Sequence, residues 1–155
     1  MQFINYFFSS IISFSGLIIG LMLVKIAPEE QKPLEKYLIY LRKILLALIS
    51  VFIIFYYFND YFNLMTLVAY AIFLFFVELK VKDLLKKSTV IYTILGILFF
   101  ISSKNANLFT IESSLILLYG LPTASLIHNK KERNQYKIVF YNSGFIVISN
   151  LLFFL

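Results

Sequence analysis

Glu112 is the residue of this sequence whose chemistry stands out most from its surroundings. It is the one carboxylate within the apolar stretch Leu108–Ile127. A carboxylate inside a membrane helix commonly carries protons, coordinates a cation or pairs with a basic residue. Pro122 lies in the same stretch, and proline removes a backbone hydrogen bond and interrupts a helix. A broken helix beside polar side chains is how many transporters build a binding site, so Glu112 and Pro122 favour transport.

A second interpretation of Glu112 stays open beside this one. The residue is four positions past Leu108, which is about 6 Å along a helix. Its side chain would then reach the outer membrane interface, or it would pair with Lys104.

Further polar side chains recur at helical spacing near the end of the chain. Together with Glu112 they define a candidate polar pathway for a small solute or ion, bounded by the first, fifth and sixth apolar segments. Its residues are Glu112, Tyr119, Thr123, Asn142, Ser149 and Asn150.

Other catalytic chemistry lacks the residues it needs. The chain has no cysteine, and His128 is its single histidine, so thiol catalysis and histidine-rich metal sites are excluded. An intramembrane aspartyl site needs two carboxylates within helices, and no glycine-rich phosphate-binding motif occurs. We therefore predict no enzymatic activity, no metal and no cofactor.

The composition is that of a chain dissolved in lipid. Of its 155 residues, 61% are hydrophobic and only 14% are charged. Soluble domains carry about 25% charged residues. We therefore predict a single all-α integral membrane domain over residues 1–155, with membrane lipids as its surroundings.

Six apolar stretches are long enough, or nearly so, to form transmembrane helices. The fourth stretch is short for a full crossing. The segment 34–43, which precedes the second stretch, resembles an amphipathic lead-in on the membrane surface. Residues 58–61 predict a tight turn between the second and third stretches. The predicted spans are 3–26, 44–58, 62–77, 88–102, 108–127 and 138–155.

The basic residues alternate between the loops. Thirteen of the 14 lie in or beside the first, third and fifth loops, and only Lys104 lies elsewhere. Under the positive-inside rule these three loops are cytoplasmic. The chain is thus predicted to form three hairpins with both termini non-cytoplasmic. The net charge of +6 belongs to this topology rather than to nucleic-acid binding.

Small residues mark the helix faces expected to pack closely. In lipid, such residues let helix backbones approach, and Gly16 and Gly20 form a GxxxG pair. The stripe either packs within the bundle or contacts a partner, which would be a second copy or another membrane protein. The second and third helices, rich in Leu, Ile and Phe, are expected nearer lipid. The predicted packing residues are Ser9, Ser13, Gly16, Gly20, Gly96 and Gly120.

The segment from Ser13 to Gly20, continued by Ile26-Ala27-Pro28-Glu29-Glu30, resembles a group of small uncharacterised prokaryotic, notably archaeal, multi-pass membrane proteins. These share an Ala-Pro-Glu-Glu turn after the first helix and a following basic helix. The resemblance covers about the first 45 residues and implies no activity.

Two functions are consistent with these observations. The first is a non-enzymatic subunit or scaffold in a prokaryotic cell membrane, packing with partner helices or lipids. The alternative is a minimal transporter or channel that uses Glu112 and the Pro122 helix break.

Overall fold

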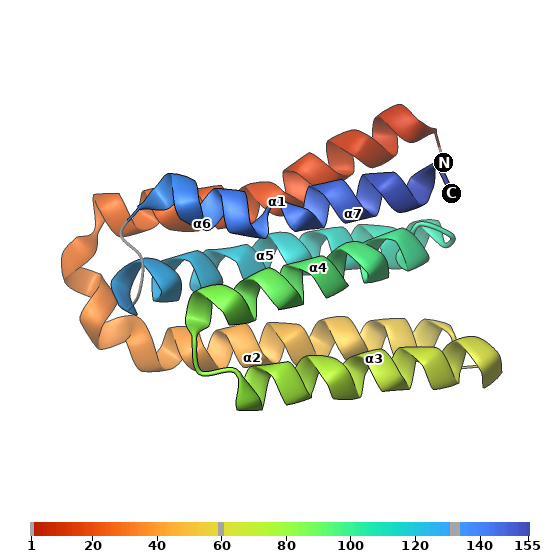
Figure 1. Ribbon diagram of the computed structural model, residues 1–155, viewed down its shortest axis with the longest axis horizontal. Coiled ribbons are helices and arrows are strands. Elements are labelled where there is room, and N and C mark those ends of the chain that lie inside the picture. Colours follow the sequence, from red (N-terminus) through yellow and green to blue (C-terminus); the bar gives the residue numbers. More distant parts are fainter. Residues whose placement is uncertain (1, 59–60, 131–133) are drawn as a thin grey trace.

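The fold is helical throughout the part of the chain that the structure, a computed structural model, describes: residues 2–58, 61–130 and 134–155 (Figure 1). The helices run along a common axis and form an elongated bundle. In chain order they are α1 (Phe3–Ile26), the short 3-10 helix η1 (Pro28–Glu30), α2 (Gln31–Tyr56), α3 (Tyr61–Lys80), α4 (Leu84–Ser102), α5 (Ala106–Lys130), α6 (Gln135–Asn142) and α7 (Gly144–Phe153).

The segment predicted to lie on the membrane surface is instead part of one continuous helix. α2 runs from Gln31 to Tyr56 and includes residues 34–43. Pro33 does not interrupt it, because it lies in the first turn, where backbone N–H groups have no partner within the helix. The amphipathic lead-in is thus continuous with the second predicted span, whose helix begins well before residue 44.

α4 is longer than the fourth predicted span. It begins at Leu84, because the Asp83 carboxylate accepts hydrogen bonds from the backbone N–H groups of Leu85 and Lys86. Its 19 residues extend about 28 Å, close to the thickness of the hydrocarbon core. The predicted turn at 58–61 includes residues 59 and 60, which lie outside the described residues, as do 131–133 of the last basic loop.

The last predicted span is divided at Ser143, between α6 and α7. The backbone N–H of Ser143 donates to the carbonyl of Phe140, three residues back, instead of continuing the α-helical pattern. The Ser143 hydroxyl donates to the same carbonyl, and Gly144 follows. Neighbouring serine and glycine residues are a common cause of helix kinks.

Helices far apart in the sequence make the principal contacts. α1 packs along α5 in the same direction, α2 also packs on α5, and α4 packs on α7. The three hairpins predicted from the loops thus describe the path of the chain, not the packing units. α3 lies at one edge, beside α2 and α4 (Figure 1).

The helices have the length and composition of membrane spans. Five in the described part of the chain are long and apolar enough to cross a bilayer: Phe3–Ile26, Pro33–Tyr56, Leu84–Ser102, Ala106–Asn129 and Gln135–Phe153. Both ends of the chain lie at the same end of the bundle (Figure 1). The fold is therefore that of an all-α protein suited to a membrane.

Candidate functional site

The glycines of α1 bring its backbone directly against α5. A Cβ atom added at Gly16 would lie 1.8 Å from the carbonyl oxygen of Leu117, and one at Gly20 would lie 2.6 Å from that of Leu121. From the other side, a Cβ at Gly120 would lie 2.4 Å from the backbone nitrogen of Leu17. The two glycines of the small-residue stripe are thus covered by α5 within the bundle.

The remaining residues of the predicted packing set are also within the bundle. Gly96 of α4 faces the backbone of Phe145 in α7, where a Cβ would come within 2.9 Å of the carbonyl oxygen. Ser13 is buried, and its hydroxyl has no hydrogen-bond partner among the described residues. Ser9 is half-buried.

Glu112 lies in the interior of the bundle, not at its surface. Its side chain is 0% exposed, and neither carboxylate oxygen has a hydrogen-bond partner within the described part of the chain. Lys104 is exposed, and the two ion pairs found among the described residues do not include it. The interpretations of Glu112 as an interfacial side chain or as the partner of Lys104 were therefore wrong.

The candidate residues of α5 share one buried face. Glu112, Tyr119 and Thr123 follow at steps of seven and four, and all three are 0% exposed. The Thr123 hydroxyl donates to the carbonyl oxygen of Tyr119 at 2.8 Å. The Tyr119 hydroxyl has no hydrogen-bond partner among the described residues.

α5 continues through Pro122 without an interruption. It is one α-helix from Ala106 to Lys130 with the proline inside it. Pro122 therefore does not create the pair of half-helices whose free ends would bind an ion or substrate, and the predicted helix break is wrong.

The candidate residues near the C-terminus form contacts of their own with α1 and α4. The Ser88 hydroxyl donates to Asn142 Oδ1 at 2.6 Å, and Asn142 Nδ2 donates to the carbonyl oxygen of Ile138. On α7, the backbone carbonyl of Ser149 accepts from the Tyr6 hydroxyl at 2.9 Å. Asn150 Nδ2 donates to the Ser10 hydroxyl at 3.1 Å.

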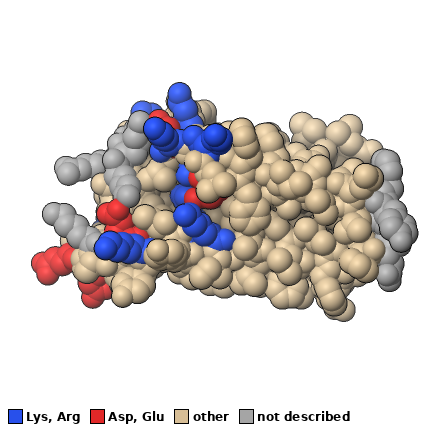
Figure 2. Space-filling view, turned by 90° about the horizontal axis from the view of Figure 1, so that it is seen from below, with Lys and Arg blue, Asp and Glu red and all other residues tan. Residues whose placement is uncertain are grey.

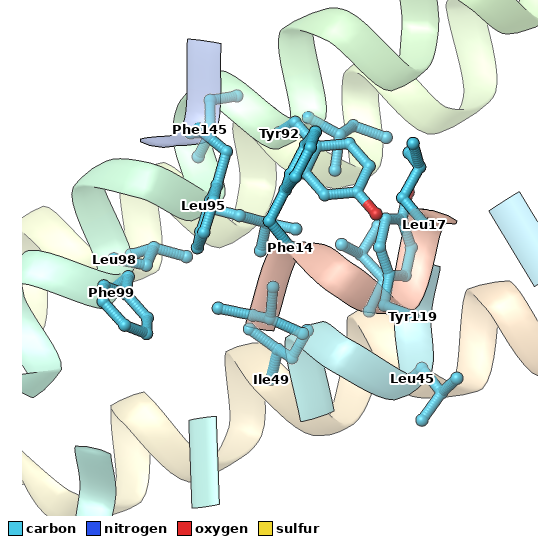
Figure 3. Packing of buried hydrophobic residues seen from close by; sticks show 14 of the residues in the cluster. Phe14, Leu17, Leu45, Ile49, Tyr92, Leu95, Leu98, Phe99, Tyr119 and Phe145 are labelled. Carbon is cyan, nitrogen blue, oxygen red and sulfur yellow. The ribbon is translucent and has the colours of Figure 1, made fainter. Parts of the chain in front are cut away.

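Aromatic rings from α1, α4, α5 and α7 pack together in the interior of the bundle (Figure 3). Tyr92 of α4 packs against Tyr119 on one side, with ring centroids 5.8 Å apart, and against Phe145 of α7 on the other, at 6.2 Å. Phe14 and Phe99 also contact Phe145. No hydrogen bond among the described residues joins the α5 candidates Glu112, Tyr119 and Thr123 to Asn142, Ser149 or Asn150.

Sequence reasoning missed a buried ionic cluster formed by α2, α3 and α4, here called the Arg42–Glu78–Lys87 cluster. Arg42 Nη2 pairs with Glu78 Oε1, which also lies 3.6 Å from Lys87 Nζ. Lys87 Nζ further donates to the backbone carbonyl of Glu78 at 2.5 Å. All three residues are buried.

Helical spacing contained the signal for this cluster. Glu78 follows the buried residues Leu67 and Leu74 at steps of seven and four. Arg42 precedes the buried residues Leu46 and Ile49 at steps of four and three. A charge in register with a buried apolar stripe faces the protein interior.

A pocket of about 250 Å³ adjoins the cluster. Three basic side chains and one acidic side chain line it, together with leucine and isoleucine. Within the cluster, Arg42 Nε and Nη1 and Glu78 Oε2 are buried without a hydrogen-bond partner among the described residues. The residues that line the pocket are Ile39, Arg42, Lys43, Glu78, Leu79, Leu84, Lys87 and Leu126.

Metal-binding residues do not gather in the described part of the chain: no group of three His, Asp or Glu side chains is found there. His128 is half-buried near the end of α5. Comparison of the chain with protein-family models, with characterised proteins and with solved structures finds no match, so similarity assigns neither a family nor an activity.

Proposed function

We propose that the protein is a non-enzymatic structural subunit of a prokaryotic cell membrane and that the outer face of α3 packs against the helices of a partner membrane protein. The observation that carries the proposal is how little of α3 the bundle covers. Among the side chains of α3 that the structure describes, the buried apolar ones are Leu67, Leu74 and Val77, which form one narrow stripe. The opposite side presents large apolar side chains, with Ile72 65% and Phe76 55% exposed.

The close packing of the helices supports the same role. Close glycine contacts hold α1 against α5, and aromatic rings of α4, α5 and α7 pack against one another. Without a hydrophobic drive between helices in lipid, van der Waals packing decides which helices associate. A helix at the edge of the bundle, with only one stripe covered, therefore gains the most van der Waals contact from a further neighbouring helix.

The topology we propose has six transmembrane helices, with both ends of this chain on the non-cytoplasmic side. Besides the five helices that qualify by length and composition, α3 has 20 residues and extends about 30 Å. Charged side chains gather at one end of the face seen in Figure 2. Lys104 follows α4 at the other end, where both termini lie (Figure 1). Positive-inside orientation makes the charged end cytoplasmic.

Gentle extraction followed by native mass spectrometry tests the structural role. We expect a stoichiometric foreign membrane subunit to accompany the chain. A particle that contains only this chain, as monomer or homodimer, would contradict the proposal.

One observation favours a second candidate function, a minimal transporter or channel for a small solute or ion. It is the burial of both Glu112 carboxylate oxygens without a hydrogen-bond partner among the described residues. Intramembrane carboxylates in this state occur in proton and ion pathways. Flux through liposomes that contain the purified protein tests it. Glu112→Gln should abolish the flux while the protein stays folded, and unchanged flux in this variant would exclude Glu112 as the transport residue.

A further inference from the structure

We propose that the pocket beside the Arg42–Glu78–Lys87 cluster binds a phosphate group that retains one proton. Such a group is inorganic phosphate at neutral pH, or the phosphate monoester of a lipid headgroup near its second pKa of about 6. This site is independent of the structural role proposed above, because it requires no partner protein.

Arg42 supplies the first argument. The residue is only 3% exposed, and the ion pair with Glu78 uses Nη2 alone. Nε and Nη1 remain without a hydrogen-bond partner among the described residues, although Arg42 lines the pocket. A buried donor without a partner costs about 1–3 kcal/mol, and more when it is charged. A guanidinium with two adjacent donors matches two oxygens of a phosphate group.

The charge of the pocket supplies the second argument. Lys43 and Lys87 line it beside Arg42, against the single carboxylate of Glu78, so the pocket carries an excess of positive charge. Lys87 already donates to the backbone carbonyl of Glu78. The nearby Asp83 carboxylate does not line the pocket and accepts hydrogen bonds from the first turn of α4.

Glu78 gives the site its selectivity. Its Oε2 atom is buried and has no hydrogen-bond partner among the described residues. An ionised carboxylate only accepts hydrogen bonds. It therefore favours an anion with an O–H group, such as hydrogen phosphate, and disfavours sulfate, which has none at neutral pH.

The size and position of the pocket fit a small headgroup. Its volume of about 250 Å³ is below the range of about 300–1,000 Å³ for sites of drug-sized ligands. It lies near the end of α3 and the beginning of α4, and four of its lining residues are charged. Basic pockets between transmembrane helices at this level bind lipid headgroups.

Thermal unfolding of the protein in a neutral detergent, at constant ionic strength, tests the site with inorganic phosphate and sulfate as probes. We expect phosphate to raise the melting temperature with a half-saturating concentration about tenfold below that of sulfate. Equal effects of the two anions would overturn the proposal.

Two variants separate a built site from general attraction to positive charge. Lys43→Gln removes an exposed lysine that lines the pocket, and we expect phosphate to bind about tenfold more weakly. Lys86→Gln removes an exposed lysine next to Lys87 that does not line the pocket, and binding should be unchanged. Equal weakening in both variants would overturn the proposal. The double variant Arg42→Met/Glu78→Met keeps the net charge but should lose the preference for phosphate over sulfate.

Phosphate binding measured in nanodiscs of phosphatidylcholine, with or without phosphatidic acid, at pH 6 distinguishes the two sources of the phosphate group. A lipid headgroup in the site would compete with free phosphate. If phosphatidic acid raises the half-saturating concentration of phosphate for the unmodified protein but not for Lys43→Gln, the site holds a lipid headgroup. If it raises neither while phosphate still binds, the site holds free phosphate. Both results uphold a phosphate site, and the absence of phosphate binding in both membranes would refute it.

Discussion

Gly16 of α1 lies so close to Leu117 of α5 that a Cβ atom at position 16 would be only 1.8 Å from the leucine carbonyl oxygen. The obstacle is backbone, not the end of a flexible side chain, so it cannot turn aside. The two helices would have to move apart, although this is the most extensive helix contact of the bundle.

Gly16→Ala should therefore lower the free energy of unfolding by about 3 kcal/mol, the upper part of the usual range for overpacking. The matched control is Gly144→Ala, because a Cβ there would meet only the Thr93 hydroxyl, at 3.4 Å. Denaturant unfolding in detergent measures both. Equal stability of the two variants would show that α1 and α5 are not in backbone contact.

The sequence could predict the small-residue stripe but not its partner. Gly16 and Gly20 are recognisable from their spacing alone. Which helix covers them depends on complementary shape, and on α5 the matching position is Gly120, a single glycine 100 residues away. The loops suggested that helices consecutive in the chain pack as hairpins. Loops constrain the order in which the helices cross, but they leave the lateral arrangement of the helices open.

Replacing Glu112 with leucine should stabilise the protein. Leucine has a similar size, and the change removes a buried carboxyl group that has no hydrogen-bond partner among the described residues. We expect the free energy of unfolding to rise by about 1–3 kcal/mol, the cost of an unsatisfied buried polar group. Ile116→Leu, one turn along the same buried face, is the control and should change stability by less than about 1.5 kcal/mol. A loss of stability in Glu112→Leu would mean that the carboxyl group does have a binding partner.

Single substitutions in the Arg42–Glu78–Lys87 cluster should cost more than a joint one. Glu78→Met leaves two buried cations without their carboxylate, and we expect a loss of about 3–5 kcal/mol. Arg42→Met should cost less, because Lys87 remains 3.6 Å from Glu78 Oε1. Arg42→Met/Glu78→Met should be close to neutral, since Lys87 keeps its hydrogen bond to the backbone carbonyl of residue 78. Additive losses in this double-mutant cycle would contradict a direct ion pair.

The sequence predicts the helices more readily than the buried ion pairs that join them. Long apolar stretches predict where the chain is helical, but the helix ends differ. α4 begins four residues before its predicted span, where Asp83 caps it, and α2 begins 13 residues before its predicted span, at Gln31. Glu78 and Arg42 lie next to the ends of apolar stretches, and hydropathy alone does not tell which side of a helix end faces the interior. The division at Ser143 depends on local backbone geometry, which an apolar stretch does not report.

The proposed orientation predicts opposite labelling of two exposed positions. The chain has no cysteine, so a single introduced cysteine is the only thiol. In intact cells, a membrane-impermeant maleimide should label Ala106→Cys at the start of α5. Lys82→Cys, between α3 and α4, should react only after the cells are permeabilised. The reverse pattern would invert the topology and place the phosphate pocket outside the cell.

The edge position of α3 predicts where a partner should be crosslinked. A photoreactive benzoylphenylalanine at Phe76, which is 55% exposed on α3, should yield one discrete adduct with another membrane protein. The matched control is Phe140 of α6, which is 77% exposed but lies across the bundle from α3 (Figure 1). At Phe140 we expect adducts with lipid only. Both sites replace an exposed aromatic residue, so neither change disturbs the core. Lipid adducts alone at Phe76, or the same protein adduct at both positions, would refute docking through α3, because that proposal requires the contact to be confined to the face the bundle leaves uncovered.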